Sequence, residues 1–183
     1  VLVPALVRPK ADGGYEMVAG HRRKCAATLA GITEMPCIVR NLSDDEATII
    51  MVDSNLQRET ILPSEKAFAY KMKLEAMKRQ GQRSDLTCAP VEHKSGKQKS
   101  RDVLAEEIGE SKDQIRRYIR LTELIPELLE KVDKGEIALR PAVDISYLPE
   151  DIQRSLLDTI EMEQCTPSYA QTRRMRILLA EGK

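Results

Sequence analysis

The chain changes its pattern near residue 43, and this change limits the folds that it can adopt. Up to that point, short apolar runs of alternating character are separated by turn residues, which is typical of strands. From Ser43 onward, capping residues and apolar side chains at helical spacing run to the end. We therefore expect an α+β protein, with a small N-terminal α/β domain over residues 1–80, a linker or mobile loop over 81–99 and an all-helical domain over 100–183.

The first part of the sequence predicts a small sheet with one helix. Cys37 lies within the last predicted strand, so we expect its side chain in the core. Ser43 followed by Glu46 forms a capping box, which predicts that the next helix begins there. The strands are predicted over residues 2–7, 15–19 and 36–40, and the helix over residues 21–30.

Helices are predicted for the rest of the chain. Ser64 is expected to cap a helix that ends at Gln80 and Gly81, with Met72 and Met77 in its core. Aromatic residues make up only 3% of the chain, so the core must be built from aliphatic side chains, as in helical proteins. The later helices are predicted over residues 100–108, 111–124, 126–134, 141–147, 149–163 and 167–180.

Charge and cysteine content exclude several classes of protein. The 29 basic and 29 acidic residues cancel, which argues against a polyanion coat over the whole surface but leaves room for local basic patches. The four cysteines are scattered and form no CxxC pair, so neither a disulfide scaffold nor a zinc finger is expected. His21 and Cys25 are four residues apart on a predicted helix, but two ligands do not make a metal site.

The ends of the chain and its hydropathy bear on where the protein works. No apolar run approaches the roughly 18 residues that a membrane helix needs, and no signal peptide is present. We therefore expect a cytoplasmic protein. The sequence opens at Val1 without a methionine and runs directly into an apolar stretch, so we also expect it to be a piece of a longer protein.

A helix-turn-helix is predicted between residues 100 and 124. Gly109 allows a tight turn between two helices, Ser111 caps the second, and Ile115 and Ile119 point inward. Lys99 lies just before the motif and Arg101 at its start, where basic side chains would meet phosphates. The outer face suits a DNA major groove and is expected to hold Ser111, Lys112, Asp113, Gln114, Arg116, Arg117 and Arg120. The alternative is an ordinary helical hairpin with a solvated basic face.

Two short stretches indicate an anion site. A predicted strand ends at Gly20, and a helix then begins with His21, Arg22 and Arg23. Basic residues at a helix start oppose the helix dipole, which suggests that a polyanion such as a phosphate chain compensates them. In the second stretch, Arg58 could add to the anion site and Asn55 could ligate a metal. The alternative for both stretches is a solvated turn.

Taken together, these pieces resemble the ParB family of DNA-partition proteins and its nucleoid-occlusion relatives. The order of the motifs carries the resemblance, since several motifs in the right order are more specific than any one alone. The matching stretches cover residues 3–9, 14–23, 26–27, 29–31, 36–40 and 54–59, and the helix-turn-helix follows after a somewhat long linker.

The resemblance implies a mechanism. In this family an N-terminal domain binds CTP with Mg²⁺, and the helix-turn-helix binds a palindromic, centromere-like DNA site. Binding of DNA favours engagement of two N-terminal domains as a dimer, which forms a CTP-switched sliding clamp in DNA segregation, and a ParA-type ATPase is the usual partner. The implied setting is the nucleoid. The segment that contacts the ATPase and the C-terminal dimerisation domain are both expected to lie outside this chain.

The resemblance also assigns residues. Val3, Pro4, Ala5 and Leu6 would lie by the cytosine. Gly20, His21, Arg22 and Arg23 match the first phosphate motif, and Ser54, Asn55 and Arg58 match the second, with Asn55 as the Mg²⁺ ligand. The family usually has Glu where His21 and Ser54 stand, and those carboxylates are associated with positioning metal and water. We therefore expect CTP binding to be retained and CTP hydrolysis, the family's CTPase activity, to be slow or absent.

Two other functions remain open at this point. A helix-turn-helix transcriptional regulator without nucleotide switching needs only the second domain. A small α/β enzyme is the third reading, since the N-terminal fold is shared with sulfiredoxin-like and nuclease-like proteins. The sequence places no catalytic nucleophile for such an enzyme.

Overall fold

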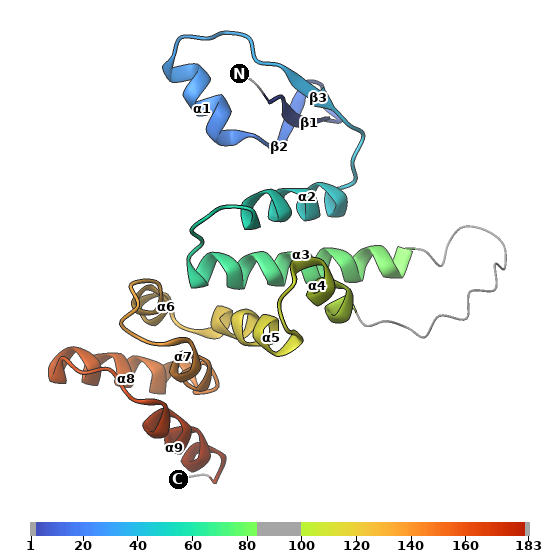
Figure 1. Ribbon diagram of the computed structural model, residues 1–183. Coiled ribbons are helices and arrows are strands. Elements are labelled where there is room, and N and C mark those ends of the chain that lie inside the picture. Colours follow the sequence, from blue (N-terminus) through green and yellow to red (C-terminus); the bar gives the residue numbers. More distant parts are fainter. Residues whose placement is uncertain (1–2, 84–99, 182–183) are drawn as a thin grey trace, which may run out of the picture. The chain divides into compact units, whose positions relative to one another are not determined.

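The computed structural model describes residues 3–83 and 100–181, which form an α+β protein with a helical second part (Figure 1). Most of the predicted linker and Lys99 therefore lie outside the described residues. These residues group into two compact units. The first holds residues 3–58 and 72–83, and the second holds residues 59–71 and 100–181. The chain therefore passes from the first unit to the second after Arg58 and returns to the first after Lys71.

The first unit contains a three-stranded sheet in the order β2-β1-β3. Strand β1 (Ala5–Pro9) pairs antiparallel with β2 (Tyr15–Ala19) and parallel with β3 (Cys37–Val39). The β1–β2 register shifts between Leu6 and Val7, beside the end of β2 that leads into α1. Helix α1 (His21–Leu29) connects β2 to β3, and Ala5, Val7 and Val18 bury the inner face.

The predicted capping box is present and starts helix α2 (Asp44–Leu56). The Ser43 hydroxyl accepts from the Glu46 backbone N–H at 3.3 Å, while the Glu46 carboxylate accepts from the Ser43 backbone N–H at 2.8 Å. The Glu46 carboxylate also accepts from the Ser43 hydroxyl at 2.8 Å, and the two hydrogen bonds that Ser43 donates to it, the backbone one contributing most, lower the pKa of the Glu46 carboxyl. Ion pairs then join α2 to helix α3 (Pro63–Arg83), where Lys73 meets Asp53 and Arg79 meets Asp45.

The start and end of α3 differ from the prediction. Ser64 is not a cap, because Pro63 begins the helix and Ser64 lies in its first turn. The Ser64 backbone N–H and hydroxyl instead donate to the Asp133 carboxylate at 2.9 and 2.5 Å. A side chain distant in sequence thus accepts the hydrogen bond from an N–H group in the first turn of α3. The helix also continues to Arg83, past the predicted end at Gln80 and Gly81.

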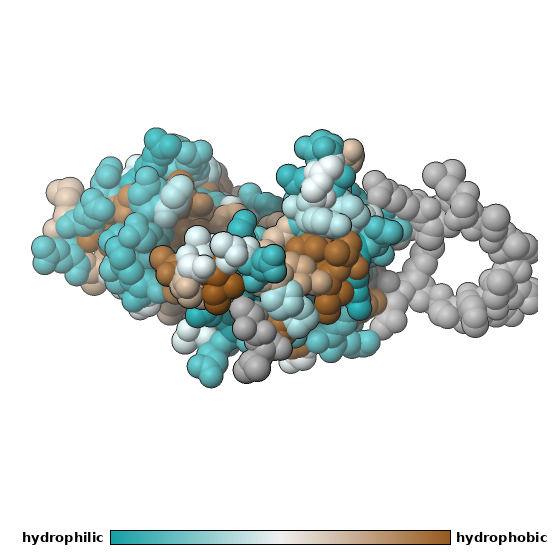
Figure 2. All heavy atoms as spheres, turned by 90° about the horizontal axis from the view of Figure 1, so that it is seen from above, coloured by the Kyte–Doolittle hydropathy of each residue, from teal (hydrophilic) through white to brown (hydrophobic). Residues whose placement is uncertain are grey.

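Two expected core positions are wrong. Cys37 is exposed, because β3 is a three-residue edge strand whose side chains are all exposed. Met72 is 41% exposed, since α3 turns Lys73, Leu74 and Ala76 inward instead. Met77 is half-buried. On the face that Figure 2 draws, apolar patches lie among hydrophilic side chains.

The second unit is a bundle of short helices around an aliphatic core. Its helices follow the predicted order, although the predicted helix 111–124 divides into α5 and a short 3₁₀ helix, Leu121–Glu123. Leu104, Ile115, Leu121, Leu128 and Ile145 are fully buried. The helices are α4 (Ser100–Ile108), α5 (Lys112–Arg120), α6 (Pro126–Asp133), α7 (Leu139–Ile145), α8 (Glu150–Glu163) and α9 (Tyr169–Ala180). Across the described ranges, no helix has both the length and the apolar character needed to cross a bilayer.

Candidate functional site

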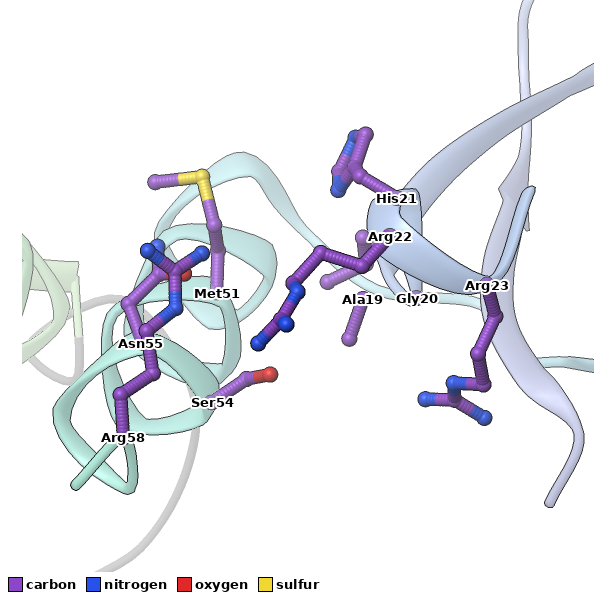
Figure 3. A pocket seen from close by; sticks show the side chains of 10 residues that line it. Ala19, Gly20, His21, Arg22, Arg23, Met51, Ser54, Asn55 and Arg58 are labelled. Carbon is purple, nitrogen blue, oxygen red and sulfur yellow. The ribbon is translucent and has the colours of Figure 1, made fainter. Parts of the chain in front are cut away.

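A cavity of about 340 Å³ opens in the first unit where the β2–α1 junction faces the end of α2 (Figure 3). Both stretches that the sequence singled out as anion motifs contribute to its wall. The structure therefore brings these two motifs together, although they are more than 30 residues apart in sequence. The lining residues are Val18, Ala19, Gly20, His21, Arg22, Arg23, Met51, Ser54, Asn55 and Arg58.

Gly20 shapes the wall of the cavity at the start of α1. Its φ of +114° is in the region that favours glycine, and it ends the preceding strand in a left-handed N-cap position. A Cβ at this position would lie 2.8 Å from the Cβ of Ala5, which is fully buried in β1. The backbone can therefore turn here only because residue 20 has no side chain.

The helix start beyond Gly20 has features of an anion site. No side chain caps α1, and its first turn holds no acidic residue, so backbone N–H groups are left without intrahelical partners. Arg22, Arg23 and Arg58 line the cavity, and no Asp or Glu does so. In the described part of the chain none of these three arginines forms an ion pair. An anion in the cavity would relieve their mutual repulsion.

The two neighbouring arginines at the start of α1 point in different directions. Figure 3 shows the Arg22 side chain extending toward Ser54 on α2, whereas Arg23 points away from α2. The Arg23 guanidinium donates to the backbone carbonyls of Val3 at 2.6 Å and Pro4 at 2.5 Å. Arg23 thus ties the segment before β1 to the wall of the cavity.

The predicted cytosine-side residues border the cavity without lining it. Val3 and Pro4 are held by Arg23, Ala5 lies beneath Gly20, and Leu6 is half-buried in β1. None of the four is among the lining residues. Their expected contact with a base stays a prediction.

Ser54 and Asn55 of the second motif lie in the last turn of α2, and Arg58 lies just beyond the end of the helix. The helix runs to Leu56, so Ser54 and Asn55 are helical and exposed. Met51, one turn before Asn55, also lines the cavity. Sequence analysis missed Met51, although residues four apart share a helix face and this spacing could have identified it.

A buried ion pair supports the second motif from behind. The Lys73 ammonium lies 2.6 Å from an Asp53 carboxylate oxygen, and the Lys73 side chain is only 3% exposed. Asp53 directly precedes Ser54, so this pair fixes the turn of α2 that faces the cavity. Sequence analysis missed Lys73, because a single lysine among the polar residues of a helix gives no signal of burial.

Metal-ligating groups are few at the cavity. Among the described residues, no three His, Cys, Asp or Glu side chains are grouped to hold a metal ion. The amide of Asn55 and the hydroxyl of Ser54 are the oxygen-bearing side chains in the lining. A hard cation could therefore be held here only if an anionic ligand supplied most of its oxygens.

The helix-turn-helix forms a second candidate site, in the second unit. Gly109 has a φ of +74° and ends α4, and the Ser111 hydroxyl caps α5 by accepting from the Gln114 N–H at 3.2 Å. Ile115 is fully buried, whereas Ile119 is half-buried. The side chains of Arg101, Ser111, Lys112, Asp113 and Arg116 are exposed, and those of Gln114 and Arg117 are half-buried.

Arg120 does not lie free on the outer face of α5, so its predicted placement was wrong. Its guanidinium donates to the Ser146 backbone carbonyl at 2.7 Å and lies over the Tyr147 ring, 4.1 Å from the ring centre. Lys112 is exposed as predicted, but it also pairs with Asp102 at 3.0 Å. The remaining basic face of α5 therefore centres on Arg116 and Arg117.

The fold and the two sites define a class of protein, in which an α+β unit with a basic cavity precedes a helix-turn-helix unit in one chain. The family model of the ParB N-terminal domain matches residues 1–56. The chain belongs to the ParB family.

Curated relatives match over most of the chain. It is 34% identical over 181 residues to the chromosome-partitioning protein Spo0J of Thermus thermophilus, covering 98% of this chain and 59% of that protein. It is 35% identical to a probable chromosome 1-partitioning protein ParB of Deinococcus radiodurans, covering 82% of this chain and 44% of that protein. A nucleoid occlusion protein of Geobacillus thermodenitrificans is 30% identical, with 98% and 57% covered. The chain thus spans between 44% and 59% of the length of these relatives.

Solved structures of a relative also match the chain. The C-terminally truncated chromosome-partitioning protein ParB of Caulobacter crescentus, complexed to the centromeric parS site, is 28% identical with a TM-score of 0.55, covering 96% of this chain and 82% of that chain. The same protein complexed with CTP-gamma-S is 30% identical with a TM-score of 0.33, covering 87% and 78%.

Proposed function

We propose that this chain binds CTP in the basic cavity and duplex DNA with α5, and acts as a partition protein that CTP switches between open and clamped states on DNA. The observation that carries the proposal is the convergence of the two phosphate motifs on one cavity whose charged lining is entirely basic. The ParB of Caulobacter crescentus has been solved in complex with the parS site and in complex with CTP-gamma-S, which supports the choice of both ligands.

The cavity suits a triphosphate. The free N–H groups at the start of α1 and the absence of a Cβ at Gly20 allow oxygens to approach the backbone. Arg22 and Arg58, from opposite walls, would each donate charge-assisted hydrogen bonds to phosphate oxygens. Arg23 would act at the edge, where it holds the Val3–Pro4 segment that is expected to face the cytosine.

Magnesium would bind together with the nucleotide. Asn55 would supply one amide oxygen, and the triphosphate would supply the others. When bound, the ion would neutralise phosphate charge. His21 and Ser54 carry no fixed negative charge, so they would neither hold the ion firmly nor orient a water. We therefore propose that CTP is bound with slow or absent hydrolysis.

The second unit would read DNA with α5. Arg116, Arg117 and Gln114 would face base edges, while Ser111, Lys112 and Arg101 would meet phosphates. Two chains are proposed to associate through their N-terminal units around the nucleotide, and a ParA-type ATPase is the proposed partner of the whole protein. Nucleoid association in the cytoplasm would follow from the binding of DNA.

Titration calorimetry with CTP, ATP, GTP and UTP in Mg²⁺ tests the nucleotide part of the proposal. CTP should bind more tightly than the other three, and Arg58→Ala should weaken CTP binding about tenfold or more, because a charge-assisted contact is lost. Arg40→Ala is a matched control, since Arg40 is exposed in the same unit and does not line the cavity. If no nucleotide binds while DNA binding persists, the chain is a helix-turn-helix regulator without nucleotide switching.

A turnover assay tests the hydrolysis part. Phosphate release from CTP in the presence of parS DNA should be slow in the natural sequence. Restoring carboxylates with His21→Glu and Ser54→Glu together should raise the rate. Equal rates in the two proteins would contradict the assignment of the missing carboxylates.

A further inference from the structure

Two arginines enclose the ring of Tyr147 in the second unit. The guanidinium carbon of Arg120 lies over the ring at 4.1 Å from its centre, and that of Arg176 lies over it at 3.8 Å. Two planar groups this close to one ring centre would overlap on a single face, so they occupy opposite faces. Arg120 is the last residue of α5 and Arg176 belongs to α9, which makes Tyr147 the link between these helices.

Arg120 is fixed by more than the ring. Its Nη2 donates to the Ser146 carbonyl at 2.7 Å, and its Nε donates to the Ser146 hydroxyl at 3.2 Å. Ser146 is the C-cap of α7 and is buried, so a cation there also suits the dipole of that helix. The end of α5 is thereby fastened to the end of α7.

Arg176 is fixed from the other side. It donates to Asp144 at 3.1 Å, and the Asp144 side chain is 10% exposed. The second Asp144 oxygen is buried and has no hydrogen-bond partner among the described residues. The charge of this carboxylate is therefore balanced mainly by Arg176, which gives Arg176 a strong reason to remain in place.

We propose that Tyr147 and Arg176 are positioning residues that aim α5, so that α9 controls how selectively the chain reads DNA. This inference rests on the proposed function of α5. Arg116 and Arg117 lie four and three residues before Arg120, about one turn away on the nine-residue helix α5, so a tilt at its fixed end displaces both. Bidentate contacts to base edges need accurate aim, whereas contacts to phosphates tolerate displacement.

The alternative role for Arg176 is a direct phosphate contact, since its side chain is 46% exposed. The two roles predict different salt dependence. Loss of a phosphate contact lowers the salt slope of binding by about 1 and weakens all sequences alike. Displacement of α5 leaves the salt slope of binding unchanged and lowers only the preference for the specific DNA site.

The test compares binding of the full chain to a parS duplex and to a scrambled duplex over a salt series. Tyr147→Leu should lower the ratio of the two affinities about fivefold or more, since it misdirects base contacts. Tyr147→Phe keeps the ring and should keep the ratio, which controls for the hydroxyl. Arg176→Gln should lower the ratio with an unchanged salt slope.

Each outcome decides between the readings. An unchanged ratio in Tyr147→Leu, or a reduced slope with equal loss on both duplexes in Arg176→Gln, overturns the positioning role. If Tyr147→Leu does not fold, as judged by its thermal unfolding, the Arg176→Gln ratio and slope decide alone. If the natural sequence itself shows no preference for parS over the scrambled duplex, the proposed function fails, which is distinguishable from failure of the positioning role.

Discussion

Gly20 and Ala5 approach so closely that no side chain fits between them. A Cβ on Gly20 would lie 2.8 Å from the Cβ of Ala5 and 3.2 Å from its Cα, and Ala5 is fully buried in the central strand. Because Gly20 also begins the wall of the basic cavity, the packing of the sheet and the geometry of the anion site depend on the same position.

Gly20→Ala should therefore destabilise the chain by about 2–4 kcal/mol, since it combines a strained φ with a steric overlap. Gly31→Ala is the matched control. Gly31 also has a positive φ, +68°, but nothing lies within 4 Å of its ideal Cβ, so only the backbone strain applies. Urea unfolding of the two variants measures the difference. Equal losses of stability would show that the contact with Ala5 contributes nothing.

The fork of Arg23 should be needed as well as its charge. Arg23 donates to both the Val3 and Pro4 carbonyls from Nη1, which leaves Nε and Nη2 for a phosphate, whereas a lysine ammonium that kept these two contacts would have no second nitrogen to offer. We expect Arg23→Lys to weaken CTP binding nearly as much as Arg23→Ala does. Arg22→Lys should be milder, because Arg22 makes no such backbone contacts among the described residues. Calorimetry on the three variants tests this, and full binding by Arg23→Lys would contradict it.

The buried ion pair behind the second motif should be important for stability. Asp53→Asn removes the negative charge 2.6 Å from Lys73, whose side chain is 3% exposed. We expect a loss of about 1–3 kcal/mol, which is below the cost for a fully buried pair because the Asp53 side chain is 41% exposed. Glu130→Gln breaks an exposed i,i+4 pair with Lys134 and should have no measurable effect. Urea unfolding of both variants is the measurement.

The capping box at α2 should make stability depend on pH. Hydrogen bonds from the backbone N–H and the side chain of Ser43 lower the pKa of Glu46, so the folded state favours the charged form. This contribution is complete above the ordinary pKa of a glutamate and is lost as the pH falls through the lowered value. Glu46→Gln should therefore be less stable than the natural sequence at about pH 7, with the difference shrinking toward about pH 3. A difference independent of pH would contradict the role of the charge.

The local features of this fold could be predicted from the sequence. The capping box at Ser43, the turn at Gly109 and the strand Tyr15–Ala19 are each specified by a few neighbouring residues, and the structure confirms all three. The convergence of the phosphate motifs followed from the family resemblance, since nothing within either motif alone brings them together.

The features that sequence analysis missed depend on residues far apart in the chain. Ser64 donates to Asp133, which is 69 residues away, so local signals could not show that Ser64 is not an N-cap. Arg120 meets Ser146, 26 residues later, and this contact removes it from the outer face of its helix. The helical pattern of α5 is the same whether or not such a contact forms.

The remaining basic residues of the helix-turn-helix should divide into two kinds. Arg117 lies on α5 and should read a base, so Arg117→Ala should weaken binding to the parS duplex by about 1–3 kcal/mol and leave the scrambled duplex nearly unaffected. Arg101 is exposed on α4 and should contact a phosphate. Arg101→Ala should weaken both duplexes alike and lower the salt slope by about 1. Fluorescence anisotropy over a salt series measures both effects. If Arg117→Ala weakened the two duplexes equally, α5 would contribute charge and not base recognition.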